Sequence, residues 1–111
     1  MIETIIKRDG RTARFDIEKI VDAVEKAFTA SGAMQSRQVA EKVAQDVVSR
    51  IEGGAIEGTP TVEGVQDLVE EALIDEGFTQ TAKAYILYRA ERSRARDVNS
   101  RIFQTLKDIT F

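Results

Sequence analysis

The chain contains no cysteine and no histidine among its 111 residues. These two absences exclude a thiolate nucleophile, a disulfide framework, a zinc finger and an imidazole base. The lack of cysteine also fits a reducing cytoplasmic compartment. Proline occurs once and glycine seven times, so the composition is that of a globular domain rather than of a disordered segment.

Long apolar runs are absent as well. None approaches the roughly 20 residues that a transmembrane helix needs. Residues 1–7 lack the charged-then-apolar layout of a signal peptide. At 111 residues the chain is long enough for one modest core and too short for two. We therefore expect one domain that has no membrane partner.

Charge is distributed unevenly along the chain. The net charge is −3, yet residues 7–19 carry five basic and three acidic side chains, and residues 83–101 carry six and two. Residues 20–82 carry four basic and twelve acidic side chains. The acidic balance argues against direct nucleic-acid binding, which needs a broad basic face. The two basic segments would form a local anion site if they met in space.

The first residues predict a β-hairpin. Two short stretches, residues 4–8 and 11–15, flank the dipeptide Asp9-Gly10. We expect a type I′ turn there, because both central positions of that turn need a positive φ.

Apolar residues then recur at helical spacing in three stretches, residues 17–28, 39–51 and 62–73. The expected helix starts are Asp16 as N-cap, Ser36, and Thr59 or Thr61 as N-cap. The expected ends are Ser31-Gly32, Gly53-Gly54 and Gly77.

A fourth helix is predicted from Thr79 to at least Arg92. We expect it to bury Ala82, Tyr85, Ile86 and Ala90. The predicted fold class is therefore α+β, with an N-terminal β-hairpin packed on a small bundle of about four α-helices.

Lys19 departs from a local rule. It falls on the third residue of the first helix, where the helix dipole favours an anion. Either it is a surface lysine paired with Glu18 or Asp22, or it serves a bound anion. Lys7 and Arg8 adjoin the hairpin turn, close in sequence to the same helix start. They either keep an edge strand soluble or complete a phosphate-binding corner.

The common nucleotide-binding motifs and clear catalytic or metal-binding groups are missing. The chain has neither GxxxxGK[ST] nor GxGxxG. The carboxylate pairs Glu70-Glu71 and Asp75-Glu76 have no accompanying nucleophile or metal ligands, so they are typical of a hydrated helix face. Gly64 costs about 1 kcal/mol relative to alanine inside a helix, so it either permits a close approach by a ligand or by the hairpin or is a tolerated cost.

Four blocks of sequence resemble the ATP-cone domain family. They are Lys7-Arg8-Asp9-Gly10, Phe15-Asp16-Ile17-Glu18-Lys19-Ile20 with Ala23 and Ala27, Thr61-Val62-Glu63-Gly64-Val65-Gln66-Asp67-Leu68-Val69-Glu70, and Ala82-Lys83-Ala84-Tyr85-Ile86-Leu87-Tyr88-Arg89. They cover roughly residues 2–93 in the family's order and spacing. The resemblance implies that a hairpin lid holds ATP or dATP, with Mg²⁺, against the helical bundle.

The resemblance also implies a set of nucleotide-binding residues. Phosphate contacts fall to Lys7, Arg8 and Lys19; Asp16 lies near the sugar or base; Ile20 packs on the base; Val62, Val65 and Gln66 line the adenine side; and Tyr88, Arg89 or Arg92 closes the site. Some family members place a carboxylate where this chain has Ala13, so the contacts to sugar and base stay open.

The last residues carry a second resemblance. Arg96-Asp97-Val98-Asn99-Ser100 and Leu106-Lys107-Asp108-Ile109-Thr110-Phe111 look like the linker into the catalytic barrel of anaerobic ribonucleoside-triphosphate reductases. We therefore expect residues 1–93 to be a nucleotide-binding domain and residues 94–111 a linker toward a catalytic domain outside this chain. In the resembled enzymes, which are homo-oligomers, dATP switches activity off and ATP keeps it on. The chain itself should be catalytically silent.

Two alternatives stay open. Repressors of reductase genes also carry an ATP-cone, but a cysteine zinc ribbon comes before it, and here only six residues precede Lys7. The other alternative is an interaction module that binds no nucleotide and docks an acidic partner through its basic ends.

Overall fold

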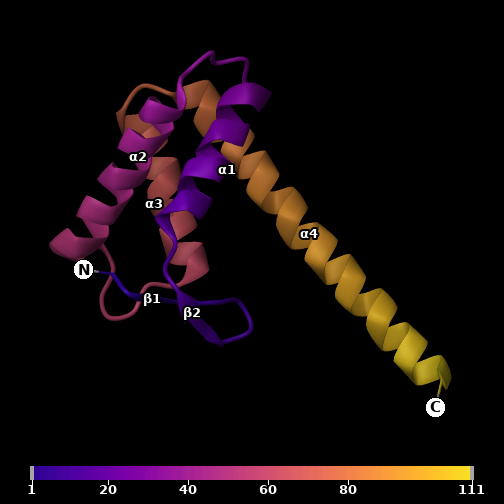
Figure 1. Cartoon of the computed structure of the whole chain (residues 1–111). Coiled ribbons are helices and arrows are strands. Elements are labelled where there is room, and N and C mark those ends of the chain that lie inside the picture. The colour runs from indigo at the N-terminus through magenta and orange to yellow at the C-terminus, as the bar shows by residue number, and fades with distance from the viewer. Residues whose placement is uncertain (1, 111) are drawn as a thin grey trace.

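The computed structural model describes the backbone of residues 2–110 and the side chains of residues 2–94. Its elements are β1 (Thr4–Ile6), β2 (Thr12–Arg14), α1 (Ile17–Ala30), α2 (Arg37–Arg50), the π-helical turn η1 (Ile51–Ala55), α3 (Val62–Asp75) and α4 (Thr79–Thr110). An antiparallel hairpin followed by four helices confirms the α+β prediction. The hairpin lies at one end of the helices, and α4 runs on beyond them (Figure 1).

The hairpin turn differs from the expected one. The strands pair with Ile5 opposite Ala13, and the Lys7 N–H donates to the Arg11 carbonyl at 2.7 Å. In the loop Gly10 has a positive φ of 86°, whereas Asp9 does not. The type I′ prediction was therefore wrong, and the loop has three residues and a left-handed glycine. The Asp9 carboxylate accepts the Arg11 N–H at 3.0 Å and so supports this longer loop.

The segment before α3 fixes the hairpin over the end of the bundle. The Ile6 N–H donates to the Pro60 carbonyl at 2.9 Å, and Ile6 forms a parallel bridge with Thr61. On the inner side of the hairpin, Ile5 and Phe15 pack against the buried core. The hairpin is therefore held by main-chain hydrogen bonds on one side and by apolar contact below.

The helix starts follow the predicted caps. Asp16 Oδ1 accepts the Glu18 N–H at 3.0 Å and caps α1. Thr61, rather than Thr59, caps α3, because its hydroxyl accepts the Gly64 N–H at 3.0 Å. Ser36 stands at the N-cap of α2 without a side-chain hydrogen bond.

Gly64 is explained by this cap. A Cβ there would lie 3.1 Å from Thr61 Oγ1 and 3.2 Å from Ile56 Cδ1. The close approach is therefore made by the cap hydroxyl and by the loop residue Ile56, and neither the hairpin nor a ligand is needed to account for it.

The core lies between helices that contact one another in a ring, since α1 and α3 each pack against both α2 and α4. The largest fully buried side chains come from α1, α2, α3 and α4, and they are Phe28, Leu73, Val21, Val24, Val43, Val47, Val69 and Thr81. Within the described residues, no helix combines the length and the hydropathy that crossing a bilayer requires.

Helix α4 buries a narrower stripe than predicted. Ala82 and Tyr85 are buried as expected, but Ile86 is 43% exposed and Ala90 is exposed. Only the side of α4 that meets α1 and α3 is covered, so positions one residue away from that stripe face outward. Beyond Arg92 the backbone stays helical to Thr110, where we expected a linker with only a weak helical pattern. The division of domain from linker near residue 93 stays a prediction.

Removal of the Thr61 hydroxyl tests the assignment of the α3 cap. We expect Thr61→Ala to lower the free energy of unfolding by about 1 kcal/mol, the usual cost of a lost N-cap, as measured by urea denaturation. The matched control is Thr59→Ala, which removes an exposed hydroxyl two residues earlier and should change stability by less than about 0.5 kcal/mol. Equal losses in the two variants would contradict the assignment of Thr61 as the cap.

Candidate functional site

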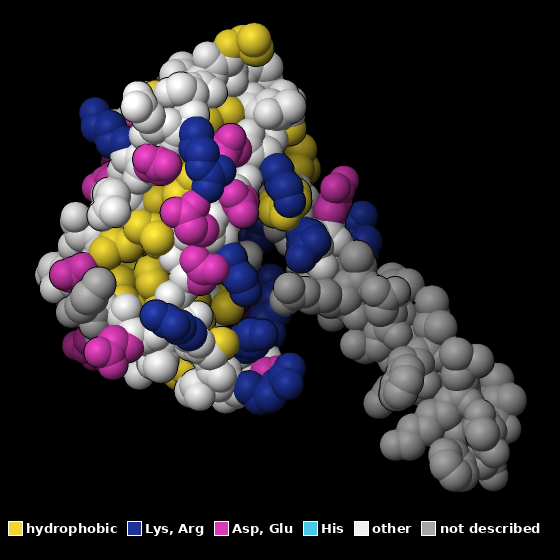
Figure 2. Space-filling model, viewed as in Figure 1, with side chains coloured by type: hydrophobic (Ala, Val, Ile, Leu, Met, Phe, Trp, Pro, Cys, Tyr) yellow, Lys and Arg dark blue, Asp and Glu magenta, His cyan; other side chains and the backbone are white. Residues whose placement is uncertain are grey.

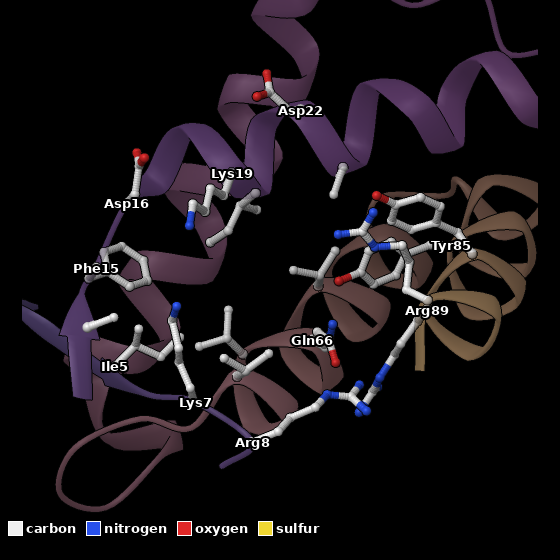
Figure 3. Close-up of a pocket in the computed structure, with 18 of the residues that line it drawn as sticks. Ile5, Lys7, Arg8, Phe15, Asp16, Lys19, Asp22, Gln66, Tyr85 and Arg89 are labelled. Atoms are coloured by element: carbon white, nitrogen blue, oxygen red, sulfur yellow. The ribbon is translucent and has the colours of Figure 1, made fainter. Parts of the chain in front are cut away.

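A cavity of about 430 Å³ lies between the hairpin, α1, α3 and α4 (Figure 3). All eleven candidate residues from the sequence line it, namely Lys7, Arg8, Asp16, Lys19, Ile20, Val62, Val65, Gln66, Tyr88, Arg89 and Arg92. The structure thus brings together positions that lie far apart in the sequence. The binding role of each residue stays a prediction.

The lining of the cavity is strongly cationic. Its charged residues are seven basic ones, Lys7, Arg8, Arg14, Lys19, Lys26, Arg89 and Arg92, and two acidic ones, Asp16 and Asp22. The lining therefore carries a formal charge of +5 in a chain whose net charge is −3. Figure 2 shows Lys and Arg side chains gathered around the hollow beside α4, while acidic side chains occupy the neighbouring face of the bundle. The two basic ends of the sequence do meet in space.

Lys7 and Lys19 form the hairpin end of this lining. In Figure 3 their side chains, which come from the hairpin and from the first turn of α1, point toward one another. Among the described side chains, neither lysine takes part in an ion pair. The carboxylates of Glu18 and Asp22, the sequence-based alternatives for Lys19, both pair with Arg37 of α2. Two like charges brought together in this way favour an anion between them.

Arg8 already bridges three elements. Its guanidinium donates to Ser93 Oγ of α4 at 2.5 Å and lies 3.8 Å from Glu63 Oε1 of α3. The hairpin loop is thereby tied to both helices on the far side of the cavity. The side chain of Arg8 is 27% exposed, so an anion entering the cavity can still reach it.

Arg89 makes more hydrogen bonds than Arg8 does. Its Nη1 donates to Asp67 at 2.7 Å and to Glu70 at 2.8 Å, and its Nη2 donates to the Glu63 carbonyl at 3.3 Å. Burial lowers the pKa of Arg89, but the hydrogen bonds to the two carboxylates outweigh burial and raise the pKa overall. The positive charge of Arg89 is therefore balanced by the carboxylates of Asp67 and Glu70, and this pairing holds α3 against α4.

A second part of the lining, the apolar wall, is formed by aliphatic and aromatic side chains. Its aliphatic and aromatic side chains are Ile5, Phe15, Ile20, Val62, Val65, Val69, Tyr85 and Tyr88. Tyr85 is 4% exposed, and burial raises the pKa of its phenol. The Lys26 ammonium and the Arg92 guanidinium lie 5.9 and 6.0 Å from the centroid of the Tyr88 ring, within the range of cation–π attraction.

Gln66 places an unused acceptor against this wall. Its Oε1 is buried and has no hydrogen-bond partner among the residues whose side chains are described. A buried acceptor left unpaired costs about 1–3 kcal/mol. Because this oxygen is buried, a ligand can pair with it only if the Gln66 side chain turns toward the cavity that it lines.

Several lining residues were missed by the sequence argument. Lys26 and Arg14 add two cations, and Ser93 supplies the partner of Arg8. Lys26 could have been found, because it lies two helical turns after Lys19 and hence on the same face of α1. Arg14 and Ser93 carried no comparable signal. Asp16 was foreseen, but its Oδ1 is engaged in capping α1.

Comparison with known proteins gives a family and a set of relatives. Residues 3–94 match the model of the ATP cone domain. The anaerobic ribonucleoside-triphosphate reductase of Haemophilus influenzae is 30% identical over 108 residues, which are 95% of this chain and 15% of that protein. The vitamin B12-dependent ribonucleoside-diphosphate reductase of Thermoplasma acidophilum is 38% identical over 104 residues, 87% of this chain and 13% of that protein.

A third relative is the ribonucleoside-diphosphate reductase subunit alpha of Chlamydia muridarum, 36% identical over 102 residues, 85% of this chain and 10% of that protein. The chain thus spans 10–15% of the length of these three relatives. They include both anaerobic and B12-dependent reductases, so similarity alone does not select one class.

The two arginines of α4 predict contrasting effects on stability. We expect Arg89→Ala to lower the free energy of unfolding by about 1–2 kcal/mol, because Asp67 and Glu70 lose a shared, partly buried partner. Arg92→Ala removes an exposed side chain one turn later and should cost less than about 0.5 kcal/mol. Urea denaturation of both variants measures the difference. A loss in the Arg89 variant no larger than that of its control would remove Arg89 as a brace.

Proposed function

Because the chain belongs to the ATP-cone domain family, we propose that it is an allosteric domain that binds ATP or dATP and controls the overall activity of a ribonucleotide reductase. The observation that carries the proposal is the cavity, whose lining has seven basic and two acidic residues beside an apolar wall in an acidic chain, and which stays cationic when the paired Arg89 is left out. A nucleoside triphosphate has the matching chemistry, with several negative charges at one end and a flat, weakly polar base at the other.

The cationic hairpin end is the proposed position of the phosphates. Lys7 and Lys19 approach each other there, and Arg8 reaches across from the loop. The N-terminus of α1 adds backbone N–H groups and the positive end of the helix dipole. Arg14 and Lys26 supply further positive charge.

The apolar wall is the proposed position of adenine. Ile20, Val62 and Val65 would contact its faces, and the unpaired Gln66 Oε1 would accept a hydrogen bond from its amino group. Asp16 lies at the start of α1, where it would approach the sugar. Tyr88 and Arg92 would close the site, and Arg89 would support it indirectly through its pairing with α3.

Mg²⁺ would enter with the triphosphate. Within the described residues no three acidic side chains are grouped so as to hold a metal ion, but Asp16, which is not paired with Arg37, offers a carboxylate at the cavity. Mg²⁺ commonly takes one or two carboxylates and fills its remaining positions with phosphate oxygens and water. A single lining carboxylate, that of Asp16, fits that pattern.

Regulation would follow from a population shift. ATP and dATP differ by one 2′-hydroxyl, so a site that ranks them must sense that group through a hydrogen bond or a steric fit. A coupling of about 1–3 kcal/mol to the oligomeric state of the parent would be typical of allosteric proteins. We propose a homo-oligomeric reductase as that parent, and its anaerobic class on the resemblance of residues 96–111, with the catalytic residues outside this chain.

Calorimetric titration with ATP and dATP tests the proposal directly. We expect Lys19→Ala to weaken binding by about 10–100-fold, because it removes a charge-assisted hydrogen bond to phosphate. Lys42→Ala is the matched control, since Lys42 is exposed on α2 and lies outside the cavity. At 100 times Kd, ATP should also stabilise the fold by about 2.7 kcal/mol. A melting temperature that millimolar ATP leaves unchanged would sink the nucleotide proposal.

Gln66 provides a test of base recognition. We expect Gln66→Leu to weaken ATP binding by about 3–10-fold, the worth of one net hydrogen bond. Inosine triphosphate has no amino group on its base, so its affinity should change by less than about twofold in the same variant. Equal losses for the two nucleotides would show that Gln66 does not read the amino group.

A further inference from the structure

Arg37, at the start of α2, gathers four carboxylates outside the cavity. Its guanidinium is hydrogen-bonded to Glu18, Asp22 and Glu25 of α1 and lies 3.7 Å from Glu41 of its own helix. The bond to Asp22 Oδ1 is 3.2 Å long. The hydrogen bonds that Arg37 donates to the carboxylates of Asp22 and Glu18 raise the pKa of Arg37. Arg37 thus pairs with all three of these α1 carboxylates.

Asp22 has competing partners on its own helix. It lines the cavity together with Lys19 and Lys26, and it stands three residues after the first lysine and four before the second. Side chains at these spacings meet on a helix surface, and an acidic residue four positions before a lysine is the favourable order. Asp22 could therefore neutralise a cavity lysine directly.

The structure shows the other arrangement. In Figure 3 the Asp22 carboxylate points away from Lys19, although Asp22 is itself a residue of the lining. Among the described ion pairs, Asp22 is paired with Arg37 and with neither lysine. The ion pair with Arg37 stabilises this orientation of Asp22. The same guanidinium also pairs with Glu18 and Glu25 of α1.

We propose that Arg37 is a positioning residue for the anion site, one that holds Asp22 away from Lys19 and Lys26 and so keeps both lysines available to an anionic ligand. The inference rests on the proposed function, since it concerns the same cavity. Arg37 itself is not part of the lining. Without it, Asp22 pairs with a lysine, and an entering polyphosphate must displace that pair.

Calorimetric titration of Arg37→Met with ATP and with inorganic tripolyphosphate tests this role. We expect affinity for both ligands to fall by about 5–10-fold, the worth of one ion-pair hydrogen bond that the ligand must break. Adding Asp22→Asn should restore both affinities to within about twofold of the starting protein. Adding Glu41→Gln restores the same net charge but removes a carboxylate of α2, so it should restore neither.

Arg50→Met is the control for a lost arginine network. Arg50 lies on the same helix, roughly 20 Å farther along it, and pairs with Asp46 at 3.2 Å and Asp75 at 2.9 Å. Its loss should leave affinity within about twofold. An Arg37→Met protein with unchanged affinity would overturn the proposal, as would equal rescue by Asp22→Asn and Glu41→Gln.

Tripolyphosphate keeps the two hypotheses apart. If the starting protein binds tripolyphosphate but not ATP, the nucleotide assignment fails while the role of Arg37 is still decided by the variants. If it binds both and Arg37→Met binds them equally well, Arg37 has no positioning role and the nucleotide assignment stands. If it binds neither, there is no anion site for Arg37 to maintain, and both ideas fail.

Discussion

The site depends on the main-chain anchor between the hairpin and the segment before α3. The hydrogen bond from Ile6 to Pro60 and the bridge to Thr61 hold the hairpin across the end of the helices. Two cations just beyond β1, Lys7 and Arg8, are thereby placed opposite the first turn of α1. Without this anchor the hairpin would lose its main-chain attachment to the segment before α3, and Lys7 and Arg8 would no longer be held at the cavity.

Helix α1 carries its acidic and its basic side chains on different faces. Its carboxylates at positions 18, 22 and 25 are held by Arg37 of α2, while Lys19 and Lys26 face the cavity. An acidic chain can in this way present a basic hollow. The arrangement requires α2 to pack beside α1, because exposed carboxylates with no outside partner would turn to the nearest lysines on the same helix.

The two arginines that α4 contributes to the cavity also differ in their partners. Arg89 is tied to Asp67 and Glu70, so its charge serves the packing of the two helices. Arg92, one turn further on, is exposed and interacts with the Tyr88 ring. Neighbouring arginines of one basic segment thus have different uses, which depend on how far each is buried and on which carboxylates lie opposite.

The sequence by itself determined the local structure. Asp16 as a cap, the hairpin around Asp9-Gly10 and the apolar stripes of three helices were all predictable, because each depends on residues within a turn or two of one another. Local charge already pointed to Lys7, Arg8 and Lys19, the other eight candidate residues came from a family resemblance, and the fold brings all eleven to one cavity. Tertiary structure decided the rest. The exposure of Ile86, the pairing of Arg89 and the capture of Asp22 by Arg37 depend on which helices lie side by side, and no periodicity within one helix encodes that choice.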